Sequence, residues 1–412
     1  MTEHCPECNG TVTRIGSGPQ WCMACEWNLG AFEPPHGVAA TRARRRDHRL
    51  AFAINRRLFA ELGAQRPERP GWTTARVGLL ATSIALLVFD LGLVGFGVYL
   101  VVTGWSLVKV VGVFLLLLGI ELRPRLPRLP KGAEMLSRSG HSRLYALVDA
   151  VGERIGAPPI DGVVVNETYN ASCNRYGLRR RRILTIGMPL WAALGPDARI
   201  ALLGHELGHL INADPGMSLL TQPALTTFGR LARIFHPHGM IRAGAYRTGA
   251  DTSPLARAAA YLIFAPLSWA AARMHVRLWK FAMRDHQRAE LYADAVSVRV
   301  GGTAGAVEVM TCVLLAESVN SAMHRASRVD GSPAHLRQAA RTALAIDRAL
   351  VLRREQHSLR IESSFLSTHP PTGLRLRVLR AWPEQRSSVA VAAAEFDAAD
   401  ANSRPSTSTW SG

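Results

Sequence analysis

His205, Glu206 and His209 have the spacing of an HExxH motif, a pattern that can bind a metal ion and activate water. Apolar residues recur around the motif at helical spacing, at positions 200, 203, 207, 210 and 211, which predicts a helix. On this helix the two imidazoles lie one turn apart on the same face, where both can bind one zinc ion. Glu206 lies beside them and is the candidate general base. Because the motif can also occur by chance, it needs support from elsewhere in the chain.

A third protein ligand is required, because catalytic zinc sites use three protein ligands and leave the fourth position open. Glu290 is the candidate, in a segment that reads as a helix ended by Gly301 and Gly302. Asp294 follows one turn later, so it could orient a ligand histidine while Glu290 binds the metal. Taken alone, Glu290 is more simply interpreted as a solvated helix residue.

Three segments together resemble the HtpX and CAAX prenyl protease family of membrane-bound zinc metallopeptidases, which are of the gluzincin type. They are the HELGH helix with its continuation to residue 214, the segment 289–295, and the segment 367–372 followed by Arg375. They occur in the family's order between residues 140 and 380. The resemblance implies that His205, His209 and Glu290 bind zinc and that Glu206 is the general base.

The resemblance also implies that the His369-Pro370-Pro371 segment lies close to the cleft. His369 or Arg375 would then help to hold the zinc site or the tetrahedral oxyanion. The alternative for this segment is a rigid turn, since prolines favour one. The implied reaction is hydrolysis of a peptide bond in a protein or peptide substrate, by a zinc-activated water and Glu206.

Residues 1–35 form a separate unit built on two CxxC pairs, Cys5 with Cys8 and Cys22 with Cys25. Four thiolates this close predict a second, structural zinc in a ribbon. So small a segment cannot bury a stabilising core, so metal binding would supply most of its folding free energy. Disulfides or a redox pair are the alternatives. Ribbons of this kind more often bind a partner than catalyse, so we expect a protein partner or a scaffold role.

Residues 36–76 are a basic linker. The whole chain has a net charge of +18, and its positive charges come almost entirely from arginine. Apolar residues interleave with the arginines, so a short amphipathic helix on the membrane surface and a solvated linker are both open. Base composition of the genome can produce such an arginine bias, and we do not predict nucleic-acid binding from charge alone.

Residues 77–122 are long enough for two membrane spans, about 77–102 and 105–122, which predicts a transmembrane hairpin in the lipid bilayer. Asp90 lies near the middle of the first span and should face protein or water. Arginines flank both ends of the hairpin, whereas the Thr103-Gly104 turn carries no charge. We therefore expect a multi-pass protein of the cell membrane, with the ribbon and the catalytic domain on the cytoplasmic side.

Residues 123–384 would form the metallopeptidase domain, with a helix at 140–155 and strands at 162–165 and 182–187. The resemblance implies an edge strand after Asn170-Ala171. Two weaker apolar stretches leave open a second membrane hairpin within 217–272 or helices packed in the soluble domain. Residues 385–412 lack apolar periodicity, which predicts a disordered tail. Cys173 and Cys312 are interpreted as packing thiols.

The predicted fold is therefore mainly α with a small β-sheet: a zincin-like metallopeptidase domain, a transmembrane hairpin and a small zinc ribbon. The predicted function is a zinc-dependent endopeptidase, with membrane protein quality control as its expected role. Two alternatives stay open, a non-catalytic membrane adaptor that uses the ribbon to recruit a partner and a prenyl-protein endopeptidase. An adaptor would have no need of Glu206, which favours the enzyme.

Overall fold

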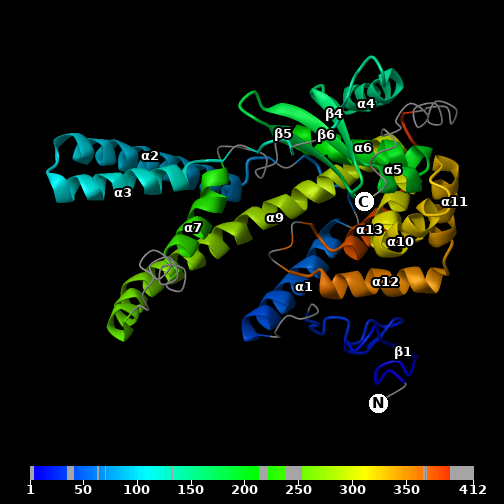
Figure 1. The fold of residues 1–412 in the computed structure, drawn as a ribbon. Coiled ribbons are helices and arrows are strands. Elements are labelled where there is room, and N and C mark those ends of the chain that lie inside the picture. Colours follow the sequence, from blue (N-terminus) through cyan, green and yellow to red (C-terminus); the bar gives the residue numbers. More distant parts are fainter. Residues whose placement is uncertain are drawn as a thin grey trace. The chain divides into compact units, whose positions relative to one another are not determined.

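The computed structural model describes residues 4–34, 41–62, 65–69, 71–125, 127–130, 133–212, 221–236, 253–364, 367 and 369–389. The chain divides into two compact units, which are described separately. The first comprises Met1–Pro70, Pro127–Ala213 and Gln287–Gly412, and the second comprises Gly71–Leu126 and Asp214–His286. The described residues are mostly helical with small sheets, so the predicted fold class is confirmed (Figure 1).

The first unit contains a four-stranded sheet in the order β3-β4-β6-β5. The strands are β3 (Met135–Leu136), β4 (Gly162–Asn166), β5 (Ala171–Tyr176) and β6 (Arg181–Gly187). β4 and β6 pair in parallel, and β5 pairs with β6 antiparallel, with Cys173 opposite Leu184. The predicted strands at 162–165 and 182–187 are present, and β5 is the edge strand expected after Asn170.

The first unit also contains several helices among its described residues. They are α1 (Arg42–Leu62), α4 (Ser142–Ile155), α5 (Met188–Ala193), α6 (Pro196–Asn212), α10 (Ala316–Ser327), α11 (Pro333–Leu344), α12 (Arg348–Ile361) and α13 (Thr372–Ala381). α4 agrees with the helix expected at 140–155. α6 carries the HExxH motif, is buried along most of its length and contacts α4 and β5.

One long helix, α9 (Pro254–Leu314), belongs in part to each unit. Gly302 interrupts it with φ of 75°, a left-handed conformation that glycine adopts without steric cost. The helix that carries Glu290 is therefore interrupted at Gly302, which is where the sequence predicts its end.

α1 is a helix packed inside the first unit, which differs from the solvated-linker interpretation of residues 36–76. Nε2 of His48 lies 2.8 Å from the carbonyl oxygen of Arg360, and Nδ2 of Asn55 donates to Oγ of Ser363 at 3.0 Å. His48 and Asn55 are buried, whereas most arginines of α1 are exposed. Residues 36–40, 63–64 and 70 of the predicted linker lie outside the described residues, as does residue 35 at the end of the predicted ribbon.

The predicted tail differs from the structure at its start. The backbone N–H of Thr303 donates to the carbonyl of Gln385 at 2.9 Å, and the N–H of Ser388 donates to that of Val300 at 3.1 Å. Residues 385–389 therefore pair with α9 through backbone groups, which a composition-based prediction cannot anticipate. Residues 390–412 lie outside the described part of the chain.

The second unit contains α2 (Thr74–Thr103), α3 (Ser106–Leu122), α7 (Gln222–Ile234) and the first part of α9. α2 and α3 form the expected hairpin and approach closely, because a Cβ at Gly112 would lie 2.8 Å from the carbonyl oxygen of Gly97. Oδ1 of Asp90 lies 3.5 Å from where a Cβ of Gly119 would be, so Asp90 faces α3.

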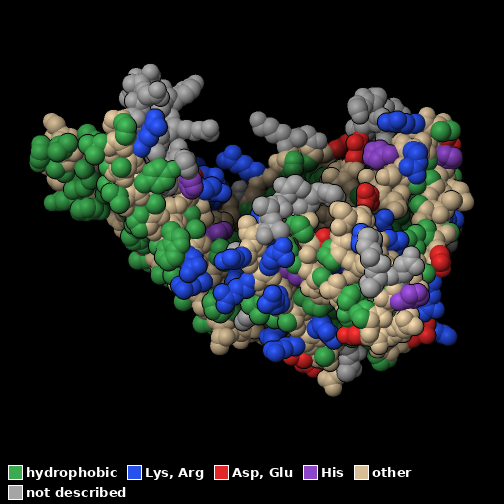
Figure 2. Space-filling model, turned by 90° about the horizontal axis from the view of Figure 1, so that it is seen from below, with side chains coloured by type: hydrophobic (Ala, Val, Ile, Leu, Met, Phe, Trp, Pro, Cys, Tyr) green, Lys and Arg blue, Asp and Glu red, His purple; other side chains and the backbone are tan. Residues whose placement is uncertain are grey.

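Two helices among the described residues are long and apolar enough to cross a membrane. The first is α2, with 6% of its most apolar window buried, and the second lies within Arg257–Leu314, with 61% of its window buried. Hydrophobic side chains cover the visible surface at the left of Figure 2, where α2 and α3 lie in Figure 1. Val88 and Leu91 of α2 and Leu117 of α3 are exposed. α7 has 13 residues, about 20 Å, which is shorter than a bilayer core.

Candidate active site

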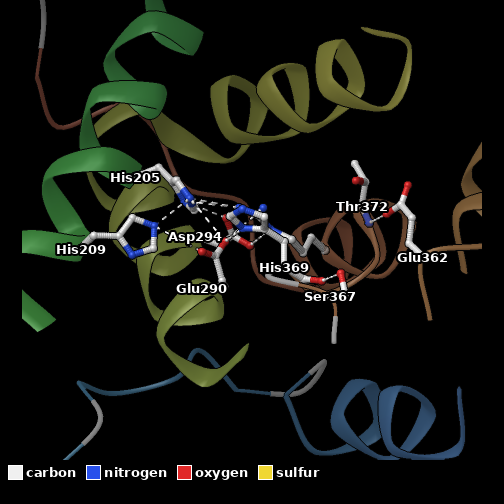
Figure 3. A network of polar contacts seen from close by, with 9 residues as sticks. His205, His209, Glu290, Asp294, Glu362, Ser367, His369 and Thr372 are labelled. Carbon is white, nitrogen blue, oxygen red and sulfur yellow. Dashed lines mark hydrogen bonds and ion pairs between the residues drawn. The ribbon is translucent and has the colours of Figure 1, made fainter. Parts of the chain in front are cut away.

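The two motif histidines point toward one another from α6. Nε2 of His209 lies 3.3 Å from Nε2 of His205, and the two rings are perpendicular (Figure 3). One helical turn separates the residues, so their side chains share the face of α6 that is turned toward α9. The pair therefore offers two imidazole nitrogens to a single point.

Glu290 on α9 completes a set of three donors. Its Oε1 lies 3.4 Å from Nε2 of His209, and its Oε2 lies 3.7 Å from Nε2 of His205. A tetrahedral zinc with ligand bonds of about 2.0–2.2 Å needs ligand atoms about 3.3–3.6 Å apart. The two imidazole nitrogens have this separation, and each lies 3.4 or 3.7 Å from one of the two Glu290 oxygens, close to the requirement. Two imidazoles with a carboxylate are a common zinc donor set. The described residues therefore fit a zinc ion.

Glycines of α6 allow α9 to come this close. A Cβ at Gly204 would lie 2.3 Å from Cγ2 of Val300, and a Cβ at Gly208 would lie 3.4 Å from Cα of Ala293. These glycines are one turn apart and directly precede His205 and His209. The close helix contact therefore holds α9 against the motif and brings Glu290 within ligand distance of both histidines.

Asp294, one turn beyond Glu290, lies behind His205. Its Oδ1 is 3.1 Å from Nδ1 of His205, on the ring nitrogen opposite the one that faces Glu290. Arg375 of α13 donates to both carboxylate oxygens of Asp294, from Nη2 at 2.5 Å and from Nε at 2.8 Å. Burial would raise the pKa of Asp294, but the charge and hydrogen bonds of Arg375 lower it below its ordinary value. Asp294 therefore stays ionised beside the histidine.

Arg375 and His369 approach Glu290 from the C-terminal segment. Nη1 of Arg375 lies 3.3 Å from Oε2 of Glu290, and Nδ1 of His369 lies 2.9 Å from the same oxygen. Burial would raise the pKa of Glu290, but the hydrogen bond from His369 and the charge of Arg375 lower it well below its ordinary value. Arg375 is buried, whereas the side chain of His369 is 57% exposed. Of the two, His369 is the one that solvent and substrate can reach.

Glu206 is buried on α6 between the two histidines. Burial raises the pKa of its carboxyl group above the ordinary value, while the neighbouring histidines lower it. A raised pKa makes a carboxylate a stronger base, which suits a group that takes a proton from water.

The four ribbon cysteines converge as the sequence predicts, and their sulfurs lie within 4.8 Å of one another. The Sγ atoms of Cys5 and Cys25, and those of Cys8 and Cys22, are 3.5 Å apart. A tetrahedral zinc with Zn–S bonds of about 2.3 Å needs sulfurs about 3.8 Å apart, so the cluster fits a structural zinc. A hydrogen bond from the backbone of Cys25 lowers the pKa of Cys22 to about 7, whereas burial and hydrogen bonds with the other three thiols raise the pKa of Cys25 to about 12.

Both CxxC pairs have the same backbone conformation. The N–H of Asn9 donates to the carbonyl of Cys5 at 2.9 Å, and the N–H of Glu26 donates to that of Cys22 at 3.0 Å. Asn9 and Glu26, each directly after a pair, have φ of 59° and 60°. Between them, β1 (Val12–Thr13) pairs with β2 (Trp21–Cys22). Two matching turns on a short hairpin are the architecture of a zinc ribbon.

The structure thus brings together His205, Glu206, His209, Glu290, Asp294, His369 and Arg375 at one site, and the four cysteines at another. Sequence reasoning missed the pairing of Arg375 with Asp294 and the close packing at Gly204 and Gly208. The spacing of Gly204 and Gly208, one turn apart, was an available signal for the close packing. Cys173 and Cys312 are buried, in agreement with packing thiols, and burial raises the pKa of each to about 12.

Comparison with known families agrees with this geometry. The family model of Peptidase family M48 matches residues 141–383, which is more than half of the chain and includes every residue of the site on α6, α9 and α13. A comparison with curated proteins finds no match. Members of this family are metal-dependent peptidases, usually with zinc. From the extent of the family match and the motifs within it, the chain belongs to Peptidase family M48.

Proposed function

We propose that this metallopeptidase is a membrane-bound zinc endopeptidase whose metal ligands are His205, His209 and Glu290. The observation that carries the proposal is the convergence of their donor atoms: the two imidazole nitrogens are 3.3 Å apart, and they lie 3.4 and 3.7 Å from the two oxygens of Glu290, which suits one zinc ion. Asp294 supports the assignment, because ligand histidines usually donate their other ring N–H to a carboxylate.

Zinc bound at this site would supply Lewis acidity, which lowers the pKa of water and polarises a carbonyl group. Glu206 acts as the proton carrier: it accepts a proton from the attacking water and donates it to the leaving amine of the cleaved peptide bond. Its burial supports this role, since the raised pKa makes the carboxylate a stronger base toward the attacking water.

His369 stabilises the oxyanion, and Arg375 positions the site. The exposed imidazole of His369 is able to donate a hydrogen bond to a substrate carbonyl that develops negative charge. Arg375 is committed to Asp294 and Glu290, so it holds the ligands in place rather than contacting substrate. The sequence left open which of the two residues contacts the oxyanion and which holds the zinc site, and this proposal gives each residue one role.

The substrate is an extended polypeptide that adds to the edge of the sheet. β5 is the edge strand of the sheet and contacts α6. A peptide that pairs with β5 makes main-chain hydrogen bonds that do not depend on its side chains. This binding mode favours unfolded segments of varied sequence, such as those of damaged or misassembled membrane proteins, over one defined recognition sequence.

The catalytic site faces the cytoplasm. The arginines on either side of the α2–α3 hairpin and the uncharged turn between the two helices support this orientation. The four free cysteines of the ribbon agree with a reducing compartment, where thiols bind zinc and do not form disulfides.

Cleavage of an unfolded model protein by the detergent-purified full chain tests the proposal. The wild type is compared with Glu206→Gln, with Glu153→Gln on the exposed side of α4 as the matched control, and zinc content is measured on each sample. We expect cleavage by the wild type and the control and loss of cleavage in Glu206→Gln at equal zinc. Full activity of Glu206→Gln would refute the assignment. Absence of cleavage by every sample, with metal in the ribbon alone, would favour the adaptor.

A further inference from the structure

The zinc ribbon docks on α12 through its central side chain. Trp21 is fully buried, and its Nε1 donates to Oε1 of Gln356 at 2.8 Å. Nε2 of the same glutamine donates to the carbonyl of Met23 at 3.0 Å. The guanidinium of Arg360 lies 4.8 Å from the centre of the Trp21 ring, and its Nη1 donates to the carbonyl of Pro19 at 2.8 Å. The ribbon is therefore held by specific contacts to its backbone and its core, and is not a freely tethered module.

A hydrophobic cluster surrounds these polar contacts. Trp21 and Leu29 of the ribbon pack with Leu359 of α12 and Leu374 of α13, and Phe52 of α1 lies against the cluster. Leu374 directly precedes Arg375. The ribbon thus shares one small core with the helix that carries an arginine of the active site.

α12 in turn fixes the beginning of α13. Oε2 of Glu362 accepts the backbone N–H of Thr372 at 2.6 Å, and Oγ of Ser358 accepts the N–H of Gly373 at 2.9 Å. These bonds satisfy two of the N–H groups that a helix start leaves without an intrahelical partner. A Cβ at Gly373 would lie 2.1 Å from the carbonyl oxygen of Glu355, so the backbones of the two helices are in direct contact. α12 and α13 therefore form one tightly packed pair.

A second connection reaches α13 directly from the ribbon. Nη1 of Arg377 lies 2.7 Å from Oε1 of Glu26, the residue after the last zinc-binding cysteine. Nε of Arg377 lies 2.7 Å from Oε1 of Glu355 on α12. Arg377 is two residues beyond Arg375, so one arginine of α13 bonds the ribbon while the other holds Asp294 and Glu290.

We propose that the ribbon is an internal support of the active site: with zinc bound, it holds α12 and α13 so that Arg375 keeps Asp294 and Glu290 in place. Without zinc the ribbon loses most of its folding free energy, and with it the docking surface around Trp21. Peptidase activity then depends on a metal ion that takes no part in catalysis. The activity readout of this proposal rests on the proposed function, whereas its structural readout does not.

The test compares Cys25→Ser with Cys25→His in the full-length protein. Cys25 is exposed, and histidine can replace a thiolate as a zinc ligand whereas serine does so poorly. For Cys25→Ser we expect loss of the ribbon zinc. We also expect kcat to fall by at least about tenfold, because catalytic groups would be displaced, while KM changes by less than about twofold. Cys25→His should restore zinc content and kcat together.

Hydrogen–deuterium exchange gives the structural readout. In Cys25→Ser the backbone amides of α13 should exchange faster, while those of β6 in the core of the sheet should not change. Gln356→Ala keeps all four cysteines but removes both hydrogen bonds that the Gln356 side chain makes to the ribbon. It should therefore also speed amide exchange in α13, with the ribbon zinc retained. Glu7→Gln, at an exposed ribbon carboxylate, is the matched control and should have no effect.

Unchanged exchange in α13 and unchanged kcat in both Cys25→Ser and Gln356→Ala would overturn the proposal and make the ribbon an independent module. Faster exchange throughout β6 as well as α13 would also overturn it, because the ribbon would then stabilise the whole domain. If the wild type cleaves no substrate, the proposed function fails, but the exchange measurements still decide whether the ribbon supports α13.

Discussion

Arg375 and Asp294 form a buried ion pair in which two nitrogens of the guanidinium meet both oxygens of the carboxylate, at 2.5 and 2.8 Å. The same carboxylate lies 3.1 Å from Nδ1 of His205. The pair therefore connects α13, through Asp294 of α9, to His205 of α6, the proposed zinc ligand, and Nη2 of Arg375 also lies 3.3 Å from Nε2 of His205. A carboxylate in this place fixes the orientation of the imidazole and increases its basicity.

Asp294→Asn should weaken the catalytic zinc site. The amide keeps the size of the side chain but loses the charge that orients His205, and loss of such a partner typically lowers metal affinity by about 10- to 100-fold. Competition with a chromophoric chelator measures the affinity. Asp149→Asn, in an exposed pair with Arg138, is the control and should leave the affinity unchanged. Equal zinc affinity in Asp294→Asn and the wild type would show that Asp294 does not support the ligand.

Gly204→Ala should destabilise the first unit and displace Glu290. The added methyl group would lie 2.3 Å from Cγ2 of Val300, and overpacking of this kind costs about 1–3 kcal/mol. Thermal unfolding and zinc content measure the two effects. Adding Val300→Ala to Gly204→Ala removes the obstructing methyl groups and should recover the zinc content.

Gly152→Ala is the matched control for this change. Gly152 also lies in a helix and is buried, but the nearest atom to its added Cβ would be Cδ1 of Leu207 at 3.9 Å, an ordinary contact. Alanine should therefore be tolerated there, with a gain of up to about 1 kcal/mol from helix propensity. If Gly204→Ala behaved like Gly152→Ala, close packing of α6 and α9 would not set the site geometry.

His369→Ala should lower kcat without removing zinc. Loss of one donor to a developing oxyanion typically costs about 10²- to 10³-fold in kcat. Steady-state kinetics with a quenched fluorescent peptide, together with metal analysis, separates this effect from loss of the metal. His324→Ala, at an exposed histidine of α10, is the control. Loss of zinc in His369→Ala would instead assign His369 to the support of Glu290.

Much of the site could be predicted from local patterns, because its main features are local. His205 and His209 are one helical turn apart, and Glu290 and Asp294 are too, so spacing alone predicts which side chains share a face. The strands around β4 and β6 were visible as runs of apolar residues, and the α2–α3 hairpin as two long apolar stretches.

The docking of the ribbon could not be predicted this way, because its contacts join distant parts of the chain. Trp21 and Gln356 are 335 residues apart in sequence, and no periodicity relates them. The packing of α1 could not be predicted for the same reason: the partners of its buried polar face, Arg360 and Ser363, lie far along the chain. An amphipathic pattern predicts that a helix has a buried face but not whether protein or lipid covers it.

Metal content of ligand variants tests the central assignment most directly. In the full-length protein, made in the Glu206→Gln background to prevent self-cleavage, one zinc ion is expected at each of the two clusters, the cysteines and the His205, His209 and Glu290 set. Replacing both histidines by alanine should leave only the ribbon zinc bound. Replacing Cys5 and Cys8 by serine should leave only the catalytic zinc bound. Retention of both zinc ions after loss of His205 and His209 would contradict the assignment of the catalytic site.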